Sequence, residues 1–398
     1  MQSVPTGHRA MILAMAFVAG CVVANIYFAQ PMLPLIAADL HVPAASIGLI
    51  PGFSLAGFAL GLALLLPLGD RYDRRIIVLV QIGLAALFAL AAALAPSFPL
   101  LLAACLGLGC VSCVPQQLVP FAAQISPPAE RGRSVGTVVS GIMMGLLLGR
   151  TVGGGLSALV GWRPVFGFAA ALMALLTVAT AFLLPKGAPT TDLSYPRLLA
   201  SLWPLLRRHG ALRRAMATQA LLWVCFNAFW ANLATLLIQG PYKLGPFWAG
   251  AFGVVGLVGA LAATAGGRGS DRMGPMRVLS ISIAIVFAAY LVMSVAAASM
   301  IALIAGVILL DLGCQSALVS NQTSVMALDP QAQGRVNTLY MTTIFLGGAI
   351  GAAISGWAMA RFGWEGVIAL GLVSAALAGV LHATGERRRA ASTAARTA

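Results

Sequence analysis

Apolar residues along this chain gather in long runs, and most of the charged residues and prolines fall between the runs. A helix needs about 20 residues, at about 1.5 Å per residue, to cross about 30 Å of hydrocarbon. Runs of about that length or longer occupy residues 10–36, 45–68, 76–95, 99–125, 134–160, 165–184, 215–239, 247–266, 278–297, 300–327, 336–360 and 365–383. We therefore expect an all-α membrane protein with twelve transmembrane helices.

The composition supports a membrane protein and excludes several soluble classes. Of the 398 residues, 60% are hydrophobic and 9% are charged, whereas soluble domains carry about 25% charged residues. So little polar surface excludes a soluble enzyme, a disordered protein and a secreted disulfide scaffold. The six cysteines all lie inside apolar runs, where we expect them to pack between helices rather than form disulfides or bind metal: Cys21, Cys105, Cys110, Cys113, Cys225 and Cys314.

A connection rich in proline and basic residues divides the chain. We expect a six-helix bundle over residues 1–184, a cytoplasmic linker over 185–214, a second six-helix bundle over 215–384 and a basic cytoplasmic tail over 385–398. Residues 195–214 mix leucines and a tryptophan with arginines. That composition predicts an amphipathic helix lying on the inner leaflet.

The distribution of Lys and Arg predicts the orientation of the chain. With the N-terminus inside, twenty of the 24 basic residues fall in cytoplasmic segments, Arg163, Lys243 and Arg361 fall outside, and Arg150 lies within a span. Because cytoplasmic loops are enriched in Lys and Arg, we expect a multi-pass protein of the bacterial inner membrane with both termini in the cytoplasm. This distribution also accounts for the net charge of +14 without a nucleic-acid partner.

The two halves of the sequence repeat each other. A shift of 202 residues superimposes several glycines and polar residues, and a shift of 201 superimposes two Asp-Arg pairs: Asn25 on Asn227, Arg133 on Arg335, Gly145 on Gly347, Gly149 on Gly351, Gly161-Trp162 on Gly363-Trp364, and Asp70-Arg71 on Asp271-Arg272. We therefore expect two pseudo-symmetric bundles with a central cavity. A solute site near the membrane midplane would open alternately to either side.

Residues 69–75, with the sequence GDRYDRR between the second and third predicted spans, resemble the loop motif of the major facilitator superfamily. That motif is G-x-x-x-D-R-x-G-R-R. This chain has Leu66 in place of the first glycine and Asp73 in place of the second, whereas the copy over residues 267–274 keeps both glycines. With twelve spans and the duplication, the resemblance covers nearly the entire chain and implies a secondary transporter.

The resemblance also implies a role for the charged residues of this loop. In the family, the loop latches the two halves together on the cytoplasmic side, and the matching residues are Asp70, Arg71, Arg74, Asp271 and Arg272. Carboxylates at helix ends beside arginines suit such a latch. They equally suit a charge cluster that only sets the topology.

The fifth predicted span carries a glycine at every fourth position, namely Gly141, Gly145, Gly149 and Gly153. Glycines at this spacing line one face of a helix and allow backbones to approach closely, so we expect them to pack the two halves together. The stretch resembles the antiporter motif G-x-x-x-G-P-x-x-G-G, with Arg150 in the proline position, and residues 24–31 (ANIYFAQP) are similar to arabinose-efflux-like permeases. These resemblances imply the efflux branch, which includes drug/proton antiporters, and a seal against proton leakage.

Two ionisable residues lie inside predicted spans. Asp311 is about eleven residues, or about 16 Å, into the tenth span, and Arg150 lies slightly outward of the middle of the fifth. A charge at that depth is costly unless it is paired or hydrated, and removal from water favours the protonated carboxyl group. We expect Asp311 to be the coupling proton site, with Arg150 as its counter-ion or an anion contact. A fixed structural pair, or two separately solvated residues, is the alternative.

The fourth helix of the resembled family usually carries a proton-relay arginine four residues before a glycine. Here Gly107 is present but Ala103 occupies the arginine position. The family mechanism therefore does not carry over directly, and Arg150 becomes a stronger candidate for a role in the mechanism.

Further polar and aromatic residues are candidates for the solute cavity, which helices 1, 4, 7 and 10 line in the resembled family. The candidates are Asn25, Tyr27, Gln116, Gln117, Asn227, Trp230, Gln315, Asn321, Gln322 and Tyr340, with Asn232 beside them. Gln315 and Gln322 share the helical face of Asp311. Buried amides must find partners, so some of these side chains are expected to bond between helices instead.

The expected function is proton-coupled efflux of a small organic solute by antiport, driven by the proton gradient and without a cofactor. Uptake or exchange of an organic anion, with Arg150 as the carboxylate contact, is the alternative. A membrane enzyme or a receptor is not supported, because the sequence shows no catalytic or metal-binding constellation, no nucleotide-binding loop and no soluble output domain. We expect a monomer whose partners are the solute and the lipid bilayer.

Overall fold

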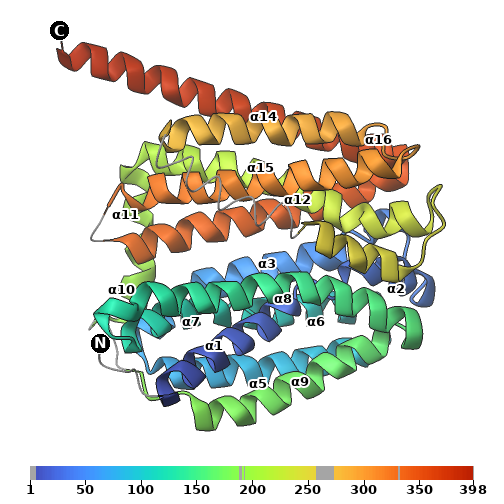
Figure 1. Cartoon of the computed structure of the whole chain (residues 1–398), viewed down its shortest axis with the longest axis horizontal. Coiled ribbons are helices and arrows are strands. Elements are labelled where there is room, and N and C mark those ends of the chain that lie inside the picture. The colour runs from blue at the N-terminus through green and yellow to red at the C-terminus, as the bar shows by residue number, and fades with distance from the viewer. Residues whose placement is uncertain (1–5, 188–190, 192, 257–272, 330–331, 398) are drawn as a thin grey trace. The chain divides into compact units, whose positions relative to one another are not determined.

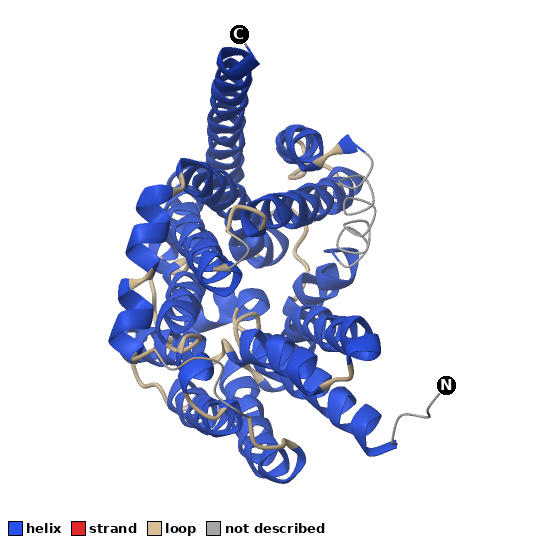
Figure 2. Ribbon diagram, turned by 90° about the vertical axis from the view of Figure 1, so that its left-hand side faces the viewer, coloured by secondary structure: helices blue, strands red, loops and turns tan. Residues whose placement is uncertain are grey.

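The computed structural model describes residues 6–187, 191, 193–256, 273–329 and 332–397. This part of the chain contains helices and loops and no strand (Figure 2). Nine of its helical segments are long and apolar enough to cross a membrane, and two shorter apolar helices, His8–Ala24 and Pro246–Gly256, accompany them. The all-α membrane fold that the apolar runs predict is confirmed.

The chain divides into two compact units, and each unit takes a short segment from the other half of the sequence. Unit 1 comprises Met1–Val42, Phe53–Leu199 and Leu244–Gly253, and unit 2 comprises Pro43–Gly52, Ala200–Lys243 and Val254–Ala398. The bundle boundaries inferred from the sequence stay a prediction.

Unit 1 holds the helices of the first half. They are α1 (Thr6–Ala24), α2 (Leu33–Asp39), most of α3 (Leu49–Leu64), α4 (Leu68–Arg71), α5 (Arg74–Ala93), α6 (Phe98–Val111), α7 (Val114–Ile125), α8 (Arg131–Val160), α9 (Trp162–Leu183) and most of α10 (Tyr195–Ala200), with the 3₁₀ turns η1 (Gln30–Met32) and η3 (Pro128–Glu130). Helix α1 packs against α8, and α5 packs against both α6 and α9 (Figure 1).

Unit 2 holds the helices of the second half. They are α11 (Leu202–Arg208), α12 (Gly210–Ile238), α14 (Pro275–Met293), α15 (Met300–Met326) and α16 (Gln333–Thr397), together with the 3₁₀ turn η2 (Ala44–Ser46). Helix α12 packs along α16, and α14 packs along α15 (Figure 1). Turn η2 also packs on α16.

The first predicted span, 10–36, is interrupted in its middle rather than continuous. Helix α1 ends at Ala24, a turn follows, and the chain resumes helical structure at η1. The amide groups of Asn25, Ile26 and Tyr27 bond to carbonyls three residues earlier instead of four. Pro31 and Pro34 stand at the starts of η1 and α2 and lack the amide donors that a continuous helix would need. Irregular backbone at membrane depth is tolerated because protein buries it.

Two further predicted spans are also broken at prolines. Span 45–68 divides into α3 and α4 next to Pro67, and span 99–125 divides into α6 and α7 just before Pro115. A proline removes one helical hydrogen bond and clashes with the preceding turn, which explains both breaks.

The last two predicted spans are joined through a single glycine. Helix α16 covers both of them, with a non-helical backbone at Gly363, whose φ is +64°. Gly161, its counterpart in the repeat, has a φ of +81° between α8 and α9. Because a side chain is strained in this left-handed region, glycine suits both turns. The repeated Gly-Trp pair thus marks the same turn in each half.

The glycine stripe of α8 packs against α1. A Cβ on Gly141 would lie 2.2 Å from the carbonyl oxygen of Ala16, and one on Gly145 would lie 2.0 Å from that of Gly20. Gly149 and Gly153 meet Ala24 and Phe28 in the same way. The close packing expected of the stripe is present, but its partner belongs to the same sequence half, whereas we expected a neighbour from the other half. The reason is that α1 and the turn that follows it, which contains Phe28, cover the face of α8 that carries the four glycines.

The predicted amphipathic linker helix forms two short helices, α10 and α11, and residues 210–214 already belong to α12. Leu198 and Leu205 are buried, whereas Trp203 is exposed with the Arg207 guanidinium carbon 4.7 Å from its ring centroid. The mixed character of the segment is therefore present, divided between two elements. Its placement on the inner leaflet stays a prediction.

Candidate functional site

Arg150, on α8, is a buried cation of unit 1. Its side chain is only 2% exposed. Its Nε donates a hydrogen bond to Gln30 Oε1 at 2.8 Å, and its guanidinium carbon lies 4.8 Å from the ring centroid of Tyr27. Both of these contacts orient the guanidinium without adding an opposite charge.

The interruption after α1 places these two partners. Tyr27 lies in the turn and Gln30 begins η1, so the irregular backbone, rather than a helical face, presents both side chains to α8. Sequence reasoning selected Tyr27 and Arg150 but missed Gln30. The sequence feature that could have pointed to Gln30 is its position in the same ANIYFAQP stretch, directly before Pro31.

The buried anion of unit 2 is Asp311, on α15, with 3% of its surface exposed. Gly256 approaches it closely: a Cβ on Gly256 would lie 3.4 Å from each carboxylate oxygen and 3.0 Å from Cζ2 of Trp230. The carboxylate and the indole ring therefore both lie close to Gly256, where a side chain would crowd them. Phe226 and Phe229 hold the indole, with ring centroids 6.2 and 5.3 Å away.

The polar face predicted for α15 is only partly assembled around Asp311. Gln315 is half-buried one turn away. Asn321 and Gln322 lie ten and eleven residues on, about 15 Å along the helix, and bond elsewhere. Asn321 Nδ2 donates to the Ala215 carbonyl at 2.9 Å, and Gln322 Nε2 donates to Asn337 Oδ1 at 2.7 Å. Helical repetition alone does not bring these amides to the carboxylate.

The repeat-related asparagines occupy similar environments in the two units. Asn25 Nδ2 lies 3.3 Å from Met173 Sδ, and Asn227 Nδ2 donates to the Trp223 carbonyl at 3.1 Å. Both are buried, and their Oδ1 atoms find no hydrogen-bond partner among the described residues. Asn232 is different, because its amide bonds to Ser355 Oγ at 2.8 Å and to the Ala228 carbonyl.

Other predicted cavity residues take local partners. Gln117 Nε2 donates to the carbonyls of Leu65 and Leu66, at 2.8 and 3.3 Å, and so stabilises the break between α3 and α4. Gln116 is half-buried. Tyr340 is buried, with its hydroxyl 3.5 Å from the Leu318 carbonyl oxygen. Solute contacts for these residues stay a prediction.

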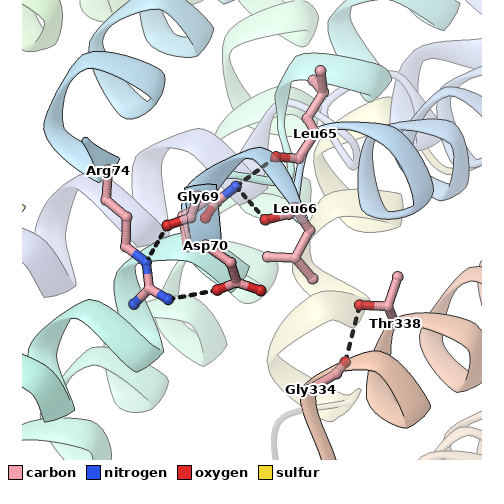
Figure 3. Close-up of polar contacts among 8 residues, drawn as sticks. Leu65, Leu66, Gly69, Asp70, Arg74, Gly334 and Thr338 are labelled. Atoms are coloured by element: carbon pink, nitrogen blue, oxygen red, sulfur yellow. Dashed lines mark hydrogen bonds and ion pairs between the residues drawn. The ribbon is translucent and has the colours of Figure 1, made fainter. Parts of the chain in front are cut away.

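The charged loop between α4 and α5 forms a local network (Figure 3). Arg74 Nη2 lies 2.9 Å from Asp70 Oδ1, and Arg74 Nε donates to the Gly69 carbonyl at 2.9 Å. Asp73, in the position of a family glycine, accepts from the amides of Arg75 and Gly187 at 2.9 and 2.8 Å. The Arg71 guanidinium carbon lies 6.0 Å from the Tyr72 ring centroid. The second copy, with Asp271 and Arg272, lies outside the described residues.

Known proteins similar to this chain are transporters. The chain is 35% identical over 369 residues to the "Uncharacterized transporter YgaY" of Escherichia coli O157:H7. The match covers 91% of this chain and 92% of that protein. It is 32% identical over 369 residues to the "Probable transporter SCO4007" of Streptomyces coelicolor, covering 92% and 86%.

Shorter matches reach two transporters of aromatic acids. The chain is 30% identical to the 3-(3-hydroxy-phenyl)propionate transporter of Escherichia coli strain K12 over 46% of this chain and 41% of that protein. It is 28% identical to the 4-hydroxybenzoate transporter PcaK of Pseudomonas aeruginosa over 39% and 35%.

A solved structure shares the fold. A bacterial homolog of the human lysosomal transporter Spinster, inward-facing and occupied, matches with a TM-score of 0.79 at 15% identity, over 97% of this chain and 98% of that one.

The helical spans and these relatives define a multi-pass membrane transporter rather than an enzyme. The family model described as the Major Facilitator Superfamily matches residues 15–351 and, overlapping them, 260–397. The chain belongs to the Major Facilitator Superfamily.

Proposed function

We propose that this transporter couples the movement of a small organic acid to protons, with Asp311 as the proton site and Arg150 as the contact for the acidic group. One observation carries the proposal. Arg150 on α8 and Asp311 on α15 have opposite charges, and both are buried within long apolar helices, at 2% and 3% exposure. Charges at such depth are costly and mark ion or substrate pathways in membrane proteins.

Asp311 supplies the coupling through its change of charge. The ionised carboxylate carries a full charge beside the Trp230 ring and the Gly256 backbone, and the protonated form carries none. Conformations that hydrate the carboxylate differently therefore bind the proton with different free energies. A proton taken up from one side of the membrane would then be released to the other as the conformation changes.

Arg150 suits the recognition of a carboxylate. A guanidinium binds a carboxylate through parallel N–H donors, and Gln30 fixes the plane of that group through Nε. The Tyr27 ring beside it offers an aromatic face. The relatives named for 3-(3-hydroxy-phenyl)propionate and 4-hydroxybenzoate act on solutes that combine a ring with a carboxylate. We therefore propose an aromatic acid as the first solute to test here.

The proposed direction is export in exchange for protons, across a bacterial inner membrane and with both chain termini in the cytoplasm. The resemblance of the α8 glycine stretch to the antiporter motif supports export, and the distribution of basic residues supports the orientation. We propose that the loop around Asp70 latches the two halves and that the protein works as a monomer.

The test is a proton-flux assay in everted membrane vesicles with an acidic interior. Benzoate-type acids, sugars and cationic drugs are added in turn, and loss of the pH gradient is followed with a fluorescent dye. Gradient loss on adding an aromatic acid supports antiport. If the acid accumulates instead in right-side-out vesicles under an inward proton gradient, and everted vesicles show no response, export is wrong.

Two substitutions separate the proposed roles. Asp311→Asn is expected to abolish gradient loss, while solute exchange without a gradient persists. The matched control is Asp329→Asn, which removes a carboxylate outside the apolar core of α15.

Arg150→Gln is expected to raise KM for acids at least about tenfold, equivalent to about 1.4 kcal/mol of lost contact, and to leave neutral solutes unaffected. Arg163→Gln removes the same charge elsewhere and serves as the control. Full proton coupling in Asp311→Asn would contradict the assignment.

A further inference from the structure

A small surface cavity of about 40 Å³ opens among α12, α14, α15 and α16 of unit 2. It is separate from Asp311, since Asn321, one of its lining residues, lies ten residues further along α15, about 15 Å away. By the topology that the basic residues predict, the helix ends that surround the cavity lie on the cytoplasmic side of the membrane.

One permanently charged side chain and one histidine line the cavity. Arg214, in the first two turns of α12, and His382, near the end of the last transmembrane stretch of α16, both line it. Arg214 lies directly over Gly385, where a Cβ would be 3.1 Å from its Nε. Because Gly385 has no side chain, the Arg214 guanidinium can occupy this position. His382 Nε2 lies 2.8 Å from Ser280 Oγ, which ties α16 to α14 at the same level.

Among the residues that the structure describes, no Asp or Glu lines the cavity, so no described lining carboxylate lies beside Arg214 there. Asp329, which follows the lining residue Leu328, has its Oδ2 3.8 Å from His209 Nε2. The amide groups at the start of α12, a helix of 29 residues, add the positive end of a helix dipole.

Apolar residues also line the cavity, namely Leu279, Val325, Leu328 and Leu381. A free inorganic anion would not interact favourably with these side chains. An amphiphile with an anionic head and a hydrocarbon body matches both kinds of lining residue, and basic pockets between transmembrane helices on the cytoplasmic side bind phosphate head groups.

We propose that this cavity binds the phosphate head group of an anionic phospholipid, with Arg214 as the principal phosphate contact and His382 as the second. The lipid would bridge α12, α14 and α16 and hold the cytoplasmic ends of these helices together. Its role is independent of proton coupling, so failure of either proposal leaves the other standing.

The test is native mass spectrometry of the full chain in detergent, titrated with phosphatidylglycerol. Parallel titrations use phosphatidylcholine, whose phosphate is balanced by choline, and inorganic phosphate as a competitor. We expect saturable binding of one phosphatidylglycerol and weaker binding of phosphatidylcholine. Arg214→Gln should weaken phosphatidylglycerol binding at least about tenfold, since charge-assisted bonds to phosphate are lost.

Controls keep the result interpretable. Arg131→Gln removes an exposed arginine of unit 1 at the same predicted membrane side and should bind like the unmodified protein. Arg214→Lys keeps the charge without the planar fork and should be intermediate, and gel filtration verifies that each variant is folded. Unchanged affinity in Arg214→Gln, or equal affinity for the two lipids, would overturn the proposal. Displacement of the lipid by millimolar inorganic phosphate would identify free phosphate as the ligand and overturn the lipid assignment.

Discussion

Gly154 of α8 and Gly250 of the Pro246–Gly256 helix are in backbone contact. A Cβ on Gly154 would lie 2.9 Å from Gly250 Cα and 2.5 Å from the Pro246 carbonyl oxygen. Their counterparts in the repeat, Gly356 and Gly48, meet in the same way within unit 2, where a Cβ on Gly356 would lie 2.7 Å from the Gly48 nitrogen. Each pair joins a helix of one sequence half to the short segment taken from the other, so the duplication extends to backbone contacts.

The adjacent glycines Gly154 and Gly155 make this contact testable. Gly154→Ala forces its Cβ into backbone atoms, and overpacking of this kind costs about 1–3 kcal/mol. Gly155→Ala meets only Phe247 Cδ2 at 3.9 Å, so it should be neutral or stabilise by up to about 1 kcal/mol through helix propensity. Thermal unfolding in detergent measures both. Equal melting temperatures for the two variants would contradict the close contact.

Gln30 is expected to act by positioning Arg150. Gln30→Ala removes the acceptor at 2.8 Å from Nε, so the guanidinium should lose its fixed plane. KM for an acidic solute should then rise about three- to tenfold, which corresponds to about 0.7–1.4 kcal/mol, the net contribution of a typical hydrogen bond. Gln30→Glu adds a charge that competes with the solute and should impair transport more. Transport kinetics of both variants, each compared with Arg150→Gln, give the measurement. A KM in Gln30→Ala equal to that of the unmodified chain would leave Gln30 without this role.

The absence of a side chain at Gly256 is expected to keep Asp311 and Trp230 uncrowded. In Gly256→Ala the new methyl group would press on Trp230 at 3.0 Å and on both carboxylate oxygens at 3.4 Å. Proton-coupled flux should fall several-fold, while the folded protein is retained because a side chain rather than a backbone must yield. Gly167→Ala, which meets nothing within 4 Å on α9, is the control. The pH dependence of flux distinguishes the two, since only Gly256→Ala should shift it.

Asp73 is expected to stabilise the start of α5. Its carboxylate accepts from the amide of Arg75 and also binds the Gly187 amide. Asp73→Ala should therefore lower stability by about 1–2 kcal/mol, the usual cost of a lost N-cap. Asp73→Asn retains an acceptor and should lose much less. Melting temperatures that rank the two variants in the opposite order would argue against capping.

Substitution of Asp70 distinguishes an effect of the Asp70–Arg74 pair on stability from an effect on the conformational equilibrium of the transporter. Because the Asp70 side chain is 45% exposed, the pair should contribute under about 1 kcal/mol to stability. Asp70→Asn should nevertheless shift the population toward the inward-open form if the loop is a latch. Labelling of cysteines introduced near the cytoplasmic ends of the helices reports that shift. A stable variant with unchanged labelling would leave the loop as a determinant of topology only.

Much of the fold is readable from the chain because the bilayer imposes simple requirements. Twenty-residue apolar runs, the repeat and the Gly-Trp turns at Gly161 and Gly363 follow from hydrocarbon thickness and from backbone conformations that favour glycine. The charged loop and the buried charges of Arg150 and Asp311 were visible for the same reason, because polar residues stand out against an apolar background.

Tertiary structure alone decided which side chains meet. The break after Ala24 depends on prolines acting within a packed environment, and it brings Gln30 to Arg150, a contact between residues 120 positions apart. The contact of Gly256 with Asp311 and Trp230, and the packing of the glycine stripe on α1, depend on how helices cross. Periodicity assigns a residue to a face of its own helix, but the neighbour of that face is chosen by packing among all the helices.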